Sequence, residues 1–246
     1  MKTMRFFSRC LWVAVAVLAL NACDLDDDDD GYSLNDAYMS IATVHPQGDG
    51  HSYSLTLDNG MTLWPAATRV SGYKPVENQR ALIYYTLLSD AFQGYDHAVQ
   101  MHDIQDILTK PYVEYQADSL EKYGDDPVEI IDMWIGDGFL NVQFGFNYGG
   151  SVLHYINLVH YPESSVAPHY FEFKHNAYND TQMHGSKGLV AFDLSKLGVN
   201  MQEAELTVKV KTFAGDKEYK VKYKNSSSVE SSVKTLKAIN DFVETK

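Results

Sequence analysis

The segment Tyr53-Ser54-Leu55-Thr56-Leu57-Asp58-Asn59-Gly60-Met61-Thr62-Leu63-Trp64 carries the clearest fold signal in the chain. Apolar and polar residues alternate on both sides of Asp58-Asn59-Gly60, as they do in β-hairpins with one buried face. A two-residue Asn-Gly loop would pair Asp58 with Met61 and place the two apolar rows on opposite faces. A three-residue loop pairs Leu57 with Met61 and Leu55 with Leu63, which keeps both rows on one face and puts Gly60 in the left-handed region. We therefore predict a three-residue hairpin.

Segments of the same kind continue along the chain. Apolar runs at 81–88 and 98–104 predict two further strands, and a second series begins at Val128. In that series the turn signal Gly136-Asp137-Gly138 separates two predicted strands, and a final hairpin is expected to close at Ala214-Gly215-Asp216. The predicted strands of the second series are 129–135, 139–146, 152–161, 170–174, 189–194, 204–210 and 219–223. Such spacing with almost no helical periodicity predicts an all-β protein, a small barrel followed by an antiparallel β-sandwich.

The first thirty residues predict export and lipidation. Lys2, Arg5 and Arg9 precede an apolar run at 11–20. This run is shorter than the roughly 20 residues that a membrane-spanning helix needs. The next residues, Leu20-Asn21-Ala22-Cys23, resemble a lipobox, so we expect cleavage before Cys23 and attachment to the membrane through lipid on this cysteine. A transmembrane anchor and an ordinary signal peptide are the alternatives.

The acidic run after Cys23 has two interpretations. Asp24-Leu25-Asp26-Asp27-Asp28-Asp29-Asp30 repels itself and stays extended, so it serves at least as a solvated spacer. It also resembles the surface-export signal of Bacteroides-type lipoproteins. We therefore expect a lipid-anchored protein of the outer membrane that is exposed on the cell surface, with a periplasm-facing anchor as the alternative.

These signals divide the chain into six expected parts. They are a signal peptide (1–22), the lipidated cysteine with its acidic tether (23–32), a barrel domain (33–115), a linker (116–127), a β-sandwich domain (128–224) and a polar tail (225–246). For the tail, a short docking helix and a loose segment both remain open.

Charge and cysteine content exclude several classes of function. The formal charge is −13, and it becomes −16 once Lys2, Arg5 and Arg9 leave with the signal. Phosphate binding needs a basic face, so a nucleic-acid partner is not expected. The two cysteines, Cys10 and Cys23, lie in the signal and at the lipidation site. The body therefore has no disulfide, no thiolate metal site and no cysteine nucleophile.

Several blocks of the sequence together resemble the NigD-like family of Bacteroides-type lipoproteins. The blocks are 53–60, 62–66, 84–88, 103–110, 134–137, 154–159 and 171–178, and they cover nearly the whole body up to about Tyr223. The resemblance implies an N-terminal OB-like barrel and a C-terminal β-sandwich. It also implies a role related to bacteriocins or immunity, and it supplies no catalytic residue.

Histidines crowd the second domain without forming an evident metal site. They are His154, His160, His169, His175 and His184. His154 and His160 are six residues apart, which is about 20 Å along a strand, so one ion cannot bind both. A site that adds His175 from a neighbouring strand stays open, but we expect structural histidines and no metal.

We expect no catalytic residues and no cofactor. The sequence contains no nucleophile elbow, HExxH motif, P-loop or dinucleotide fingerprint. Asp132, Asp137 and Glu172 could supply a carboxylate pair for glycoside hydrolysis, but any acidic protein offers such pairs. A hydrolase that acts on an envelope polymer is therefore the third hypothesis.

Exposed aromatic residues could recognise glycans. Tyr148, Tyr155, Tyr161 and Tyr170 are the candidate ligand-facing residues, although most tyrosines in a β-protein are half-buried strand residues. The leading hypothesis is a non-enzymatic envelope lipoprotein that displays a module for binding or assembly with an envelope protein. A glycan-binding accessory lipoprotein is the alternative.

One modification site stands out in the expected linker. Asp118-Ser119-Leu120 matches the Asp-Ser/Thr-apolar pattern that Bacteroides-type organisms use for O-glycosylation, so Ser119 is a candidate acceptor. Asp180-Thr181-Gln182 lacks the apolar third residue and is expected to stay unmodified.

Overall fold

The computed structural model describes residues 36–224, apart from 49, 151, 168 and 198–202. The predictions for the signal peptide, Cys23, the acidic tether and the tail 225–246 therefore lie outside the described residues. Within the described part, no helix is long and apolar enough to cross a membrane.

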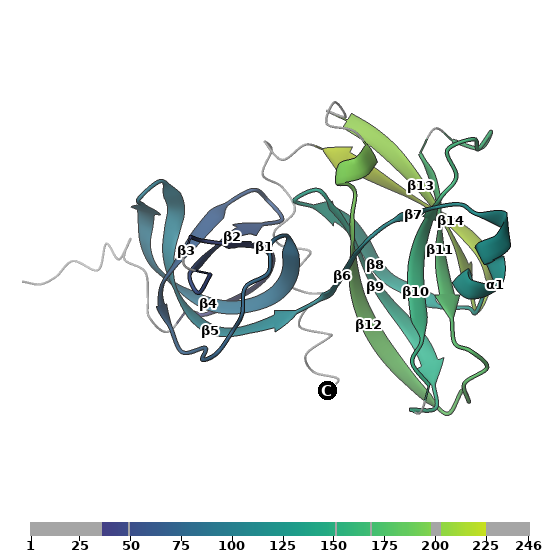
Figure 1. The fold of residues 1–246 in the computed structure, drawn as a ribbon, viewed down its shortest axis with the longest axis horizontal. Helices are drawn as coiled ribbons and strands as arrows, with labels where there is room; N and C mark the ends of the chain where they lie inside the picture. The colour runs from purple at the N-terminus through teal and green to yellow at the C-terminus, as the bar shows by residue number, and fades with distance from the viewer. Residues whose placement is uncertain (1–35, 49, 151, 168, 198–202, 225–246) are drawn as a thin grey trace, which may run out of the picture. The chain divides into compact units, whose positions relative to one another are not determined.

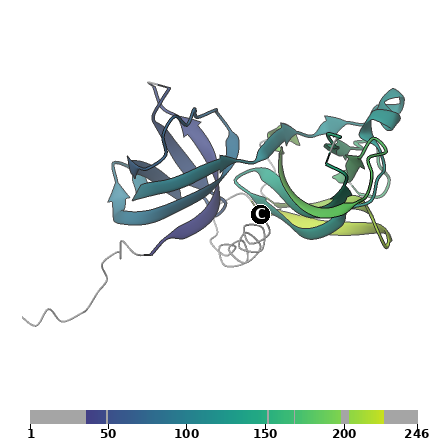
Figure 2. The same ribbon diagram turned by 90° about the horizontal axis from the view of Figure 1, so that it is seen from below.

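The N-terminal domain is a closed five-stranded barrel, as predicted (Figure 2). Its strands follow the order β1-β2-β3-β5-β4 around the barrel, and β4 returns to pair with β1. Closure removes the free edges that would otherwise pair with other chains. Side chains at alternating positions fill the interior, among them Leu55, Leu63, Ile83 and Met101. The strands are β1 (Tyr38–Pro46), β2 (Tyr53–Leu57), β3 (Thr62–Thr68), β4 (Gln79–Phe92) and β5 (Tyr95–Asp106).

The β2–β3 hairpin has the predicted three-residue register. Leu55 pairs with Leu63, and the backbone N–H of Leu57 donates to Met61 O at 2.8 Å. Gly60 has a φ of 84°, which is the left-handed conformation that this loop requires. Leu55 and Leu63 are both fully buried, so the register places both apolar rows in the core.

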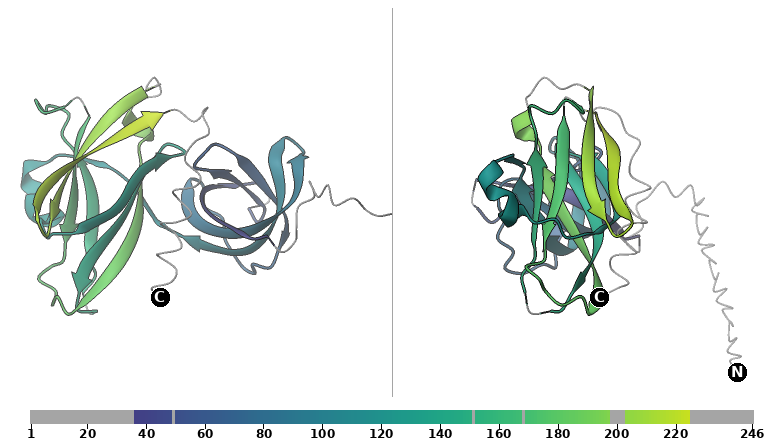
Figure 3. Two further views of the ribbon diagram at one scale, coloured as in Figure 1. Left: turned by 180° about the vertical axis from the view of Figure 1, so that it is seen from behind. Right: turned by 90° about the vertical axis from the view of Figure 1, so that its right-hand side faces the viewer.

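The C-terminal domain is a sandwich of two sheets (Figures 1 and 3). One sheet has the order β14-β13-β11-β10-β7 and the other the order β6-β12-β9-β8. Both contribute to one core that contains Leu140, Phe192, Leu158, Phe171 and Leu206. The strands are β6 (Leu108–Pro111), β7 (Val113–Glu114), β8 (Glu129–Gly136), β9 (Phe139–Tyr148), β10 (Tyr155–His160), β11 (Tyr170–Asn176), β12 (His184–Asp193), β13 (Glu203–Thr212) and β14 (Gly215–Lys224).

Two predicted turns have different outcomes. The β8–β9 turn is confirmed, because Gly136 pairs with Phe139 and the two residues between them have positive φ values. The β13–β14 turn lies one residue earlier than predicted, since Thr212 pairs with Gly215. The Thr212 hydroxyl fixes this turn by donating to Gly215 O at 2.6 Å.

The predicted end of the barrel domain at residue 115 is wrong. Strands β6 and β7, which cover residues 108–114, pair with β12 and β10 of the sandwich. Both pairings are parallel, as is the pairing of β11 with β13, whereas the hairpins of the sandwich are antiparallel. These short segments lack the alternation of a hairpin, so local pattern assigned them to the preceding domain.

The predicted linker 116–127 is also corrected, because it forms part of the sandwich domain. It contains the 3-10 turn η1 (Ala117–Ser119) and the helix α1 (Leu120–Tyr123). The Asn176 amide donates to the carbonyl oxygens of Glu121 and Lys122 at 3.0 and 3.2 Å, and Tyr123 is buried. The polar composition of the segment reflects its position on an outer sheet face.

Candidate functional site

The outer face of the five-stranded sheet carries a patterned row of charges. In β11, Phe171 and Phe173 point into the core, so Glu172 and Lys174 point outward. In β13, Val208 and Val210 are core residues and Lys209 and Lys211 alternate with them. Glu172 pairs directly with Lys209, and Lys209 pairs with Glu218 of β14, so opposite charges alternate across three strands.

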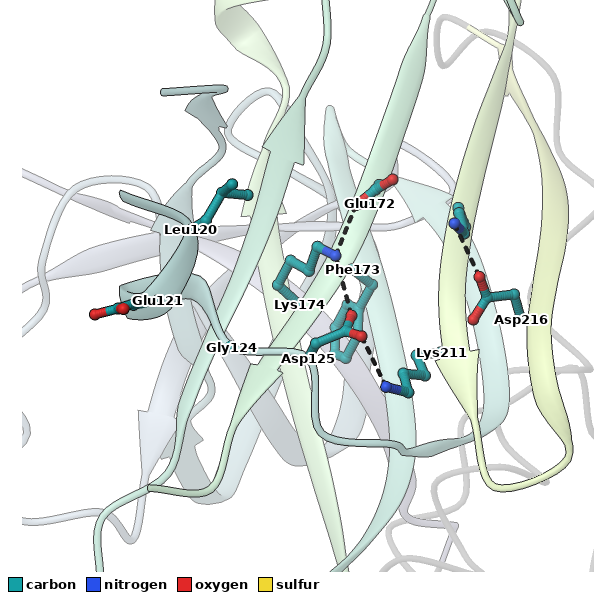
Figure 4. A pocket seen from close by; sticks show the side chains of 10 residues that line it. Leu120, Glu121, Gly124, Asp125, Glu172, Phe173, Lys174, Lys211 and Asp216 are labelled. Carbon is teal, nitrogen blue, oxygen red and sulfur yellow. Dashed lines mark hydrogen bonds and ion pairs between the residues drawn. The ribbon is translucent and has the colours of Figure 1, made fainter. Parts of the chain in front are cut away.

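Glu172 and Lys174 of β11 and Lys209 and Lys211 of β13 line a depression of about 560 Å³ (Figure 4). Lys174 Nζ lies 2.7 Å from Glu172 Oε2 and 3.1 Å from Asp125 Oδ1. Asp125 Oδ2 in turn lies 2.8 Å from Lys211 Nζ, and Lys209 Nζ lies 2.9 Å from Asp216 Oδ2. We call the residues Asp125, Glu172, Lys174, Lys209, Lys211 and Asp216 the charged face.

The loop after α1 places Asp125 over the sheet. Gly124 has a φ of 71°, and a Cβ at this position would lie 2.5 Å from Asn176 Cβ, so only glycine fits. The next turn is held because the backbone N–H of Asp126 donates to His175 O at 2.9 Å. Asp125 therefore reaches Lys174 and Lys211 from a fixed position.

Electrostatics favour the ionised forms of Asp125, Lys174 and Lys209. Burial raises the pKa of Asp125, but hydrogen bonds from Lys211 and Lys174 outweigh this and hold the pKa below its usual range. Burial lowers the pKa of Lys174, but hydrogen bonds to Glu172 and Asp125 raise it overall. The pKa of Lys209 is raised by its hydrogen bond to Asp216. Lysines with raised pKa values stay cationic near neutral pH, so they suit recognition better than proton abstraction.

Two tyrosines extend the charged face. The Tyr161 hydroxyl donates to Glu172 Oε2 at 3.1 Å, and its ring stacks on Tyr115 with 4.6 Å between the centroids. Burial and the nearby Glu172 carboxylate raise the pKa of Tyr161, so it remains a neutral donor. Tyr161 is thus a predicted aromatic that does border the site, whereas Tyr115 was not singled out from the sequence.

The other predicted aromatics do not gather there. Tyr148 and Tyr155 are 37% and 43% exposed and lie near the ends of β9 and β10 that adjoin the β9–β10 loop. Tyr170 is only 8% exposed, so the expectation that it faces a ligand is wrong. It packs edge-on against Tyr161 at 5.9 Å, and its outward strand position is covered by that ring.

Three of the five predicted histidines, His154, His160 and His175, contact other polar side chains. His154 Nδ1 lies 2.9 Å from His175 Nε2, and His154 Nε2 lies 3.2 Å from Asp180 Oδ2. His160 Nδ1 lies 3.1 Å from both carboxylate oxygens of Glu114. Among the residues that the structure describes, no group of three or more potential ligands is arranged to hold a metal ion.

The three carboxylates considered for hydrolysis lie on separate elements with separate partners. Asp132 accepts the backbone N–H of Met133, and Glu172 belongs to the charged face. Asp137 lies in the β8–β9 turn, where burial raises its pKa. They therefore do not form a pair around one position.

A buried ionic cluster was not predicted from the sequence. Arg80 is fully buried, its guanidinium binds the Asp58 carboxylate, and it donates to Thr43 Oγ1 at 2.9 Å. The Trp134 indole N–H donates to the other Asp58 oxygen at 2.7 Å. The sequence feature that could have predicted this cluster is a single arginine at the start of the apolar run Arg80-Ala81-Leu82-Ile83. Such a cation needs a buried partner.

Comparison with known proteins agrees with both halves of this fold. The N-terminal OB domain of NigD-like proteins matches residues 41–107, and their C-terminal β-sandwich domain matches residues 111–223. A crystal structure from Parabacteroides distasonis, of a protein that carries the name toxin-related protein, is 41% identical with a TM-score of 0.70. The alignment covers 78% of this chain and 95% of that one.

The chain belongs to the NigD-like family.

More distant structures share the fold of this NigD-like protein. A protein from Bacteroides caccae named as a NigD-like immunity protein is 21% identical with a TM-score of 0.58, covering 76% of this chain and 94% of its own. A protein from Bacteroides fragilis named as a lipoprotein is 10% identical with a TM-score of 0.57, covering 78% of this chain and all of its own. No curated protein matches the chain at a significant level.

The structure explains two of the sequence blocks that resemble NigD-like proteins. Asp58 of the block 53–60 and Trp134 of the block 134–137 meet in the buried cluster around Arg80. A Cβ on Gly136 would lie 2.1 Å from Asp58 Cγ, so glycine is required beside this carboxylate. These two blocks therefore serve the fold.

Proposed function

We propose that this NigD-like protein is a non-enzymatic envelope lipoprotein that binds a proteinaceous partner, in the manner of an immunity protein. The charged face is the observation that carries the proposal. It presents three lysines and three carboxylates at fixed spacing on one sheet. Surfaces of this kind select partners with complementary charge and speed their encounter.

The mixture of signs favours a protein partner. The carboxylates of Asp125, Glu172 and Asp216 would repel a polyanion. The lysines of the same face would repel a polycation. A folded protein can match both signs at once. Tyr115 lies beside this surface and is 39% exposed, and tyrosine is a common anchor at protein interfaces.

The names of two related structures support an immunity role. The 41% identical structure is named as toxin-related, and a more distant one is named as a NigD-like immunity protein. Both names fit a chain that neutralises or recognises a toxin. The lysines of the charged face are all held in ion pairs, which suits binding.

A protection assay tests this function. Cells that lack the gene are exposed to culture supernatants of related strains, and survival is compared with that of wild-type and complemented cells. We expect deletion to sensitise cells to at least one supernatant in a protease-sensitive manner, and the intact gene to restore survival. Equal survival with and without the gene across such supernatants contradicts an immunity role.

The envelope location is proposed from the lipobox at Cys23 and the acidic run after it. A related structure named as a lipoprotein supports this location.

Cys23→Ala is expected to release the protein from membranes or to leave it unprocessed, because the acyl chains are lost. Neutral residues in place of 26–30 are expected to keep membrane attachment and to reduce protease access on intact cells. If Cys23→Ala still fractionates with membranes, the lipid anchor is contradicted. If the variant with neutral residues at 26–30 shows unchanged protease access, the acidic run is only a spacer and not an export signal.

A further inference from the structure

A second depression of about 600 Å³ is lined by Lys122 and Tyr123 of α1, whereas Leu120 and Glu121 of α1 line the depression at the charged face. Residues of β6, β7, β10 and η2 (Ser195–Leu197) also line the second depression. Its volume is within the range of pockets that hold small molecules, roughly 300–1,000 Å³. We call it the lysine pocket, after Lys110, Lys122 and Lys196 in its wall.

The charge of the lysine pocket differs from that of the charged face. Its single acidic lining residue is Glu114, and both Glu114 oxygens face His160 Nδ1 at 3.1 Å. In the part of the chain that the structure describes, none of the three lysines of the pocket forms an ion pair with a carboxylate, whereas every lysine of the charged face does. In a body of strongly negative net charge, this pocket is a local cationic site.

Lys110 is a half-buried residue of the pocket. Its Nζ donates to Ile156 O at 2.7 Å and to Asn157 Oδ1 at 2.9 Å, which uses two of its three donors. Burial lowers the pKa of Lys110, and the charge of Lys122 lowers it further. Lys110 and Lys122 thus bring two like charges to one cavity, whose single carboxylate, Glu114, contacts His160. A bound anion would relieve the repulsion between the two lysines.

The remaining wall suits a sugar ring. Tyr155 is 43% exposed and touches Tyr178 edge-on at 5.6 Å, so its ring is held in place and offers an apolar surface. The side chain of Gln116 lies in the same lining and can exchange hydrogen bonds with hydroxyl groups. We propose that the lysine pocket binds a saccharide that carries an anionic group, either a carboxylate or a phosphate.

Calorimetry on the full chain in detergent tests the proposal with five probes. The probes are glucuronate, glucose 6-phosphate, glucose, acetate and inorganic phosphate. We expect at least one anionic sugar to bind more tightly than glucose and than its bare anion, and the tighter of the two sugars identifies the anion. Binding is expected to weaken as salt concentration rises.

Variants locate the binding. Lys122→Glu with Lys196→Glu changes two exposed side chains and is expected to weaken the anionic sugar about tenfold or more. Lys110→Met is expected to abolish binding, and Tyr155→Ala to weaken the sugar but not the bare anion. Lys74→Glu, an exposed change in the barrel, is the matched control and is expected to leave affinity unchanged.

Three results overturn the proposal. The first is that neither anionic sugar binds, and the second is that glucose binds equally well. The third is that the double variant at Lys122 and Lys196 binds like the control, which would place any binding elsewhere.

Discussion

His175 links the stability of the sandwich to pH. It is buried, and desolvation followed by the charge of His154 lowers its pKa below the ordinary value of 6.5. Below pH 6.5 the unfolded chain gains a proton that the folded chain resists, so the free energy of unfolding falls as the pH falls from about 7 toward 5. The slope from one such group is at most about 1.4 kcal/mol per pH unit.

Denaturant titrations at several pH values between 7.5 and 5 measure this slope. His175→Gln is expected to flatten it, and His184→Gln, an exposed change at the start of β12, is expected to leave it as in the wild type. A slope that His175→Gln does not alter would assign the acid sensitivity to other groups.

Individual side chains were predictable where their role is local. Gly60 followed from the face that the alternating leucines must share. Arg80 was not predictable in the same way, because its partner Asp58 comes from the β2–β3 turn and its partner Thr43 from β1, and only the closed barrel brings them together. Tyr170 was misjudged for a similar reason, since the ring that covers it belongs to Tyr161, nine residues away in sequence.

The β2–β3 hairpin offers the sharpest test of an element. Gly60→Ala forces a side chain into a left-handed conformation, at a cost of about 1 kcal/mol. Gly48→Ala is the matched control, because a Cβ there meets no atom within 4 Å and its backbone conformation is ordinary. Chemical denaturation of the full chain should show the loss for Gly60→Ala alone. Equal stability of the two variants would contradict the three-residue register.

The elements that sequence patterns missed are those stabilised by distant partners. Strands β6 and β7 are short and pair in parallel with β12 and β10, more than 40 residues later in the chain. Helix α1 spans four residues and is held by Asn176 of β11. Neither feature has a periodicity of its own, so the charged face and the lysine pocket, which both depend on α1, could not be assembled from the sequence.

Ser119 tests whether this segment is modified. It lies at the end of η1, lines the lysine pocket and is half-buried, with its hydroxyl 3.3 Å from Asp118 Oδ1. O-glycosylation in the native host is expected to raise the intact mass of the wild-type protein and not that of Ser119→Ala. If the two masses differ only by the lost oxygen, Ser119 is unmodified.

As a whole molecule, the chain combines a closed barrel with a sandwich whose five-stranded sheet carries the charged face. The barrel interior is filled by the side chains of its own core. The proposed recognition belongs to the sandwich, where rigid strands hold lysines and carboxylates in fixed pairs. This assignment predicts that the charged face contacts the partner directly.

Site-specific photo-cross-linking in living cells measures that contact most directly. A photoreactive residue is placed at Lys211 of the charged face or at Lys74 of the barrel, and cells are exposed to a supernatant that kills the deletion strain. We expect a protease-sensitive adduct from position 211 and none from position 74. An adduct from position 74 alone, or from neither position in cells that the protein protects, would contradict the charged face as the recognition surface.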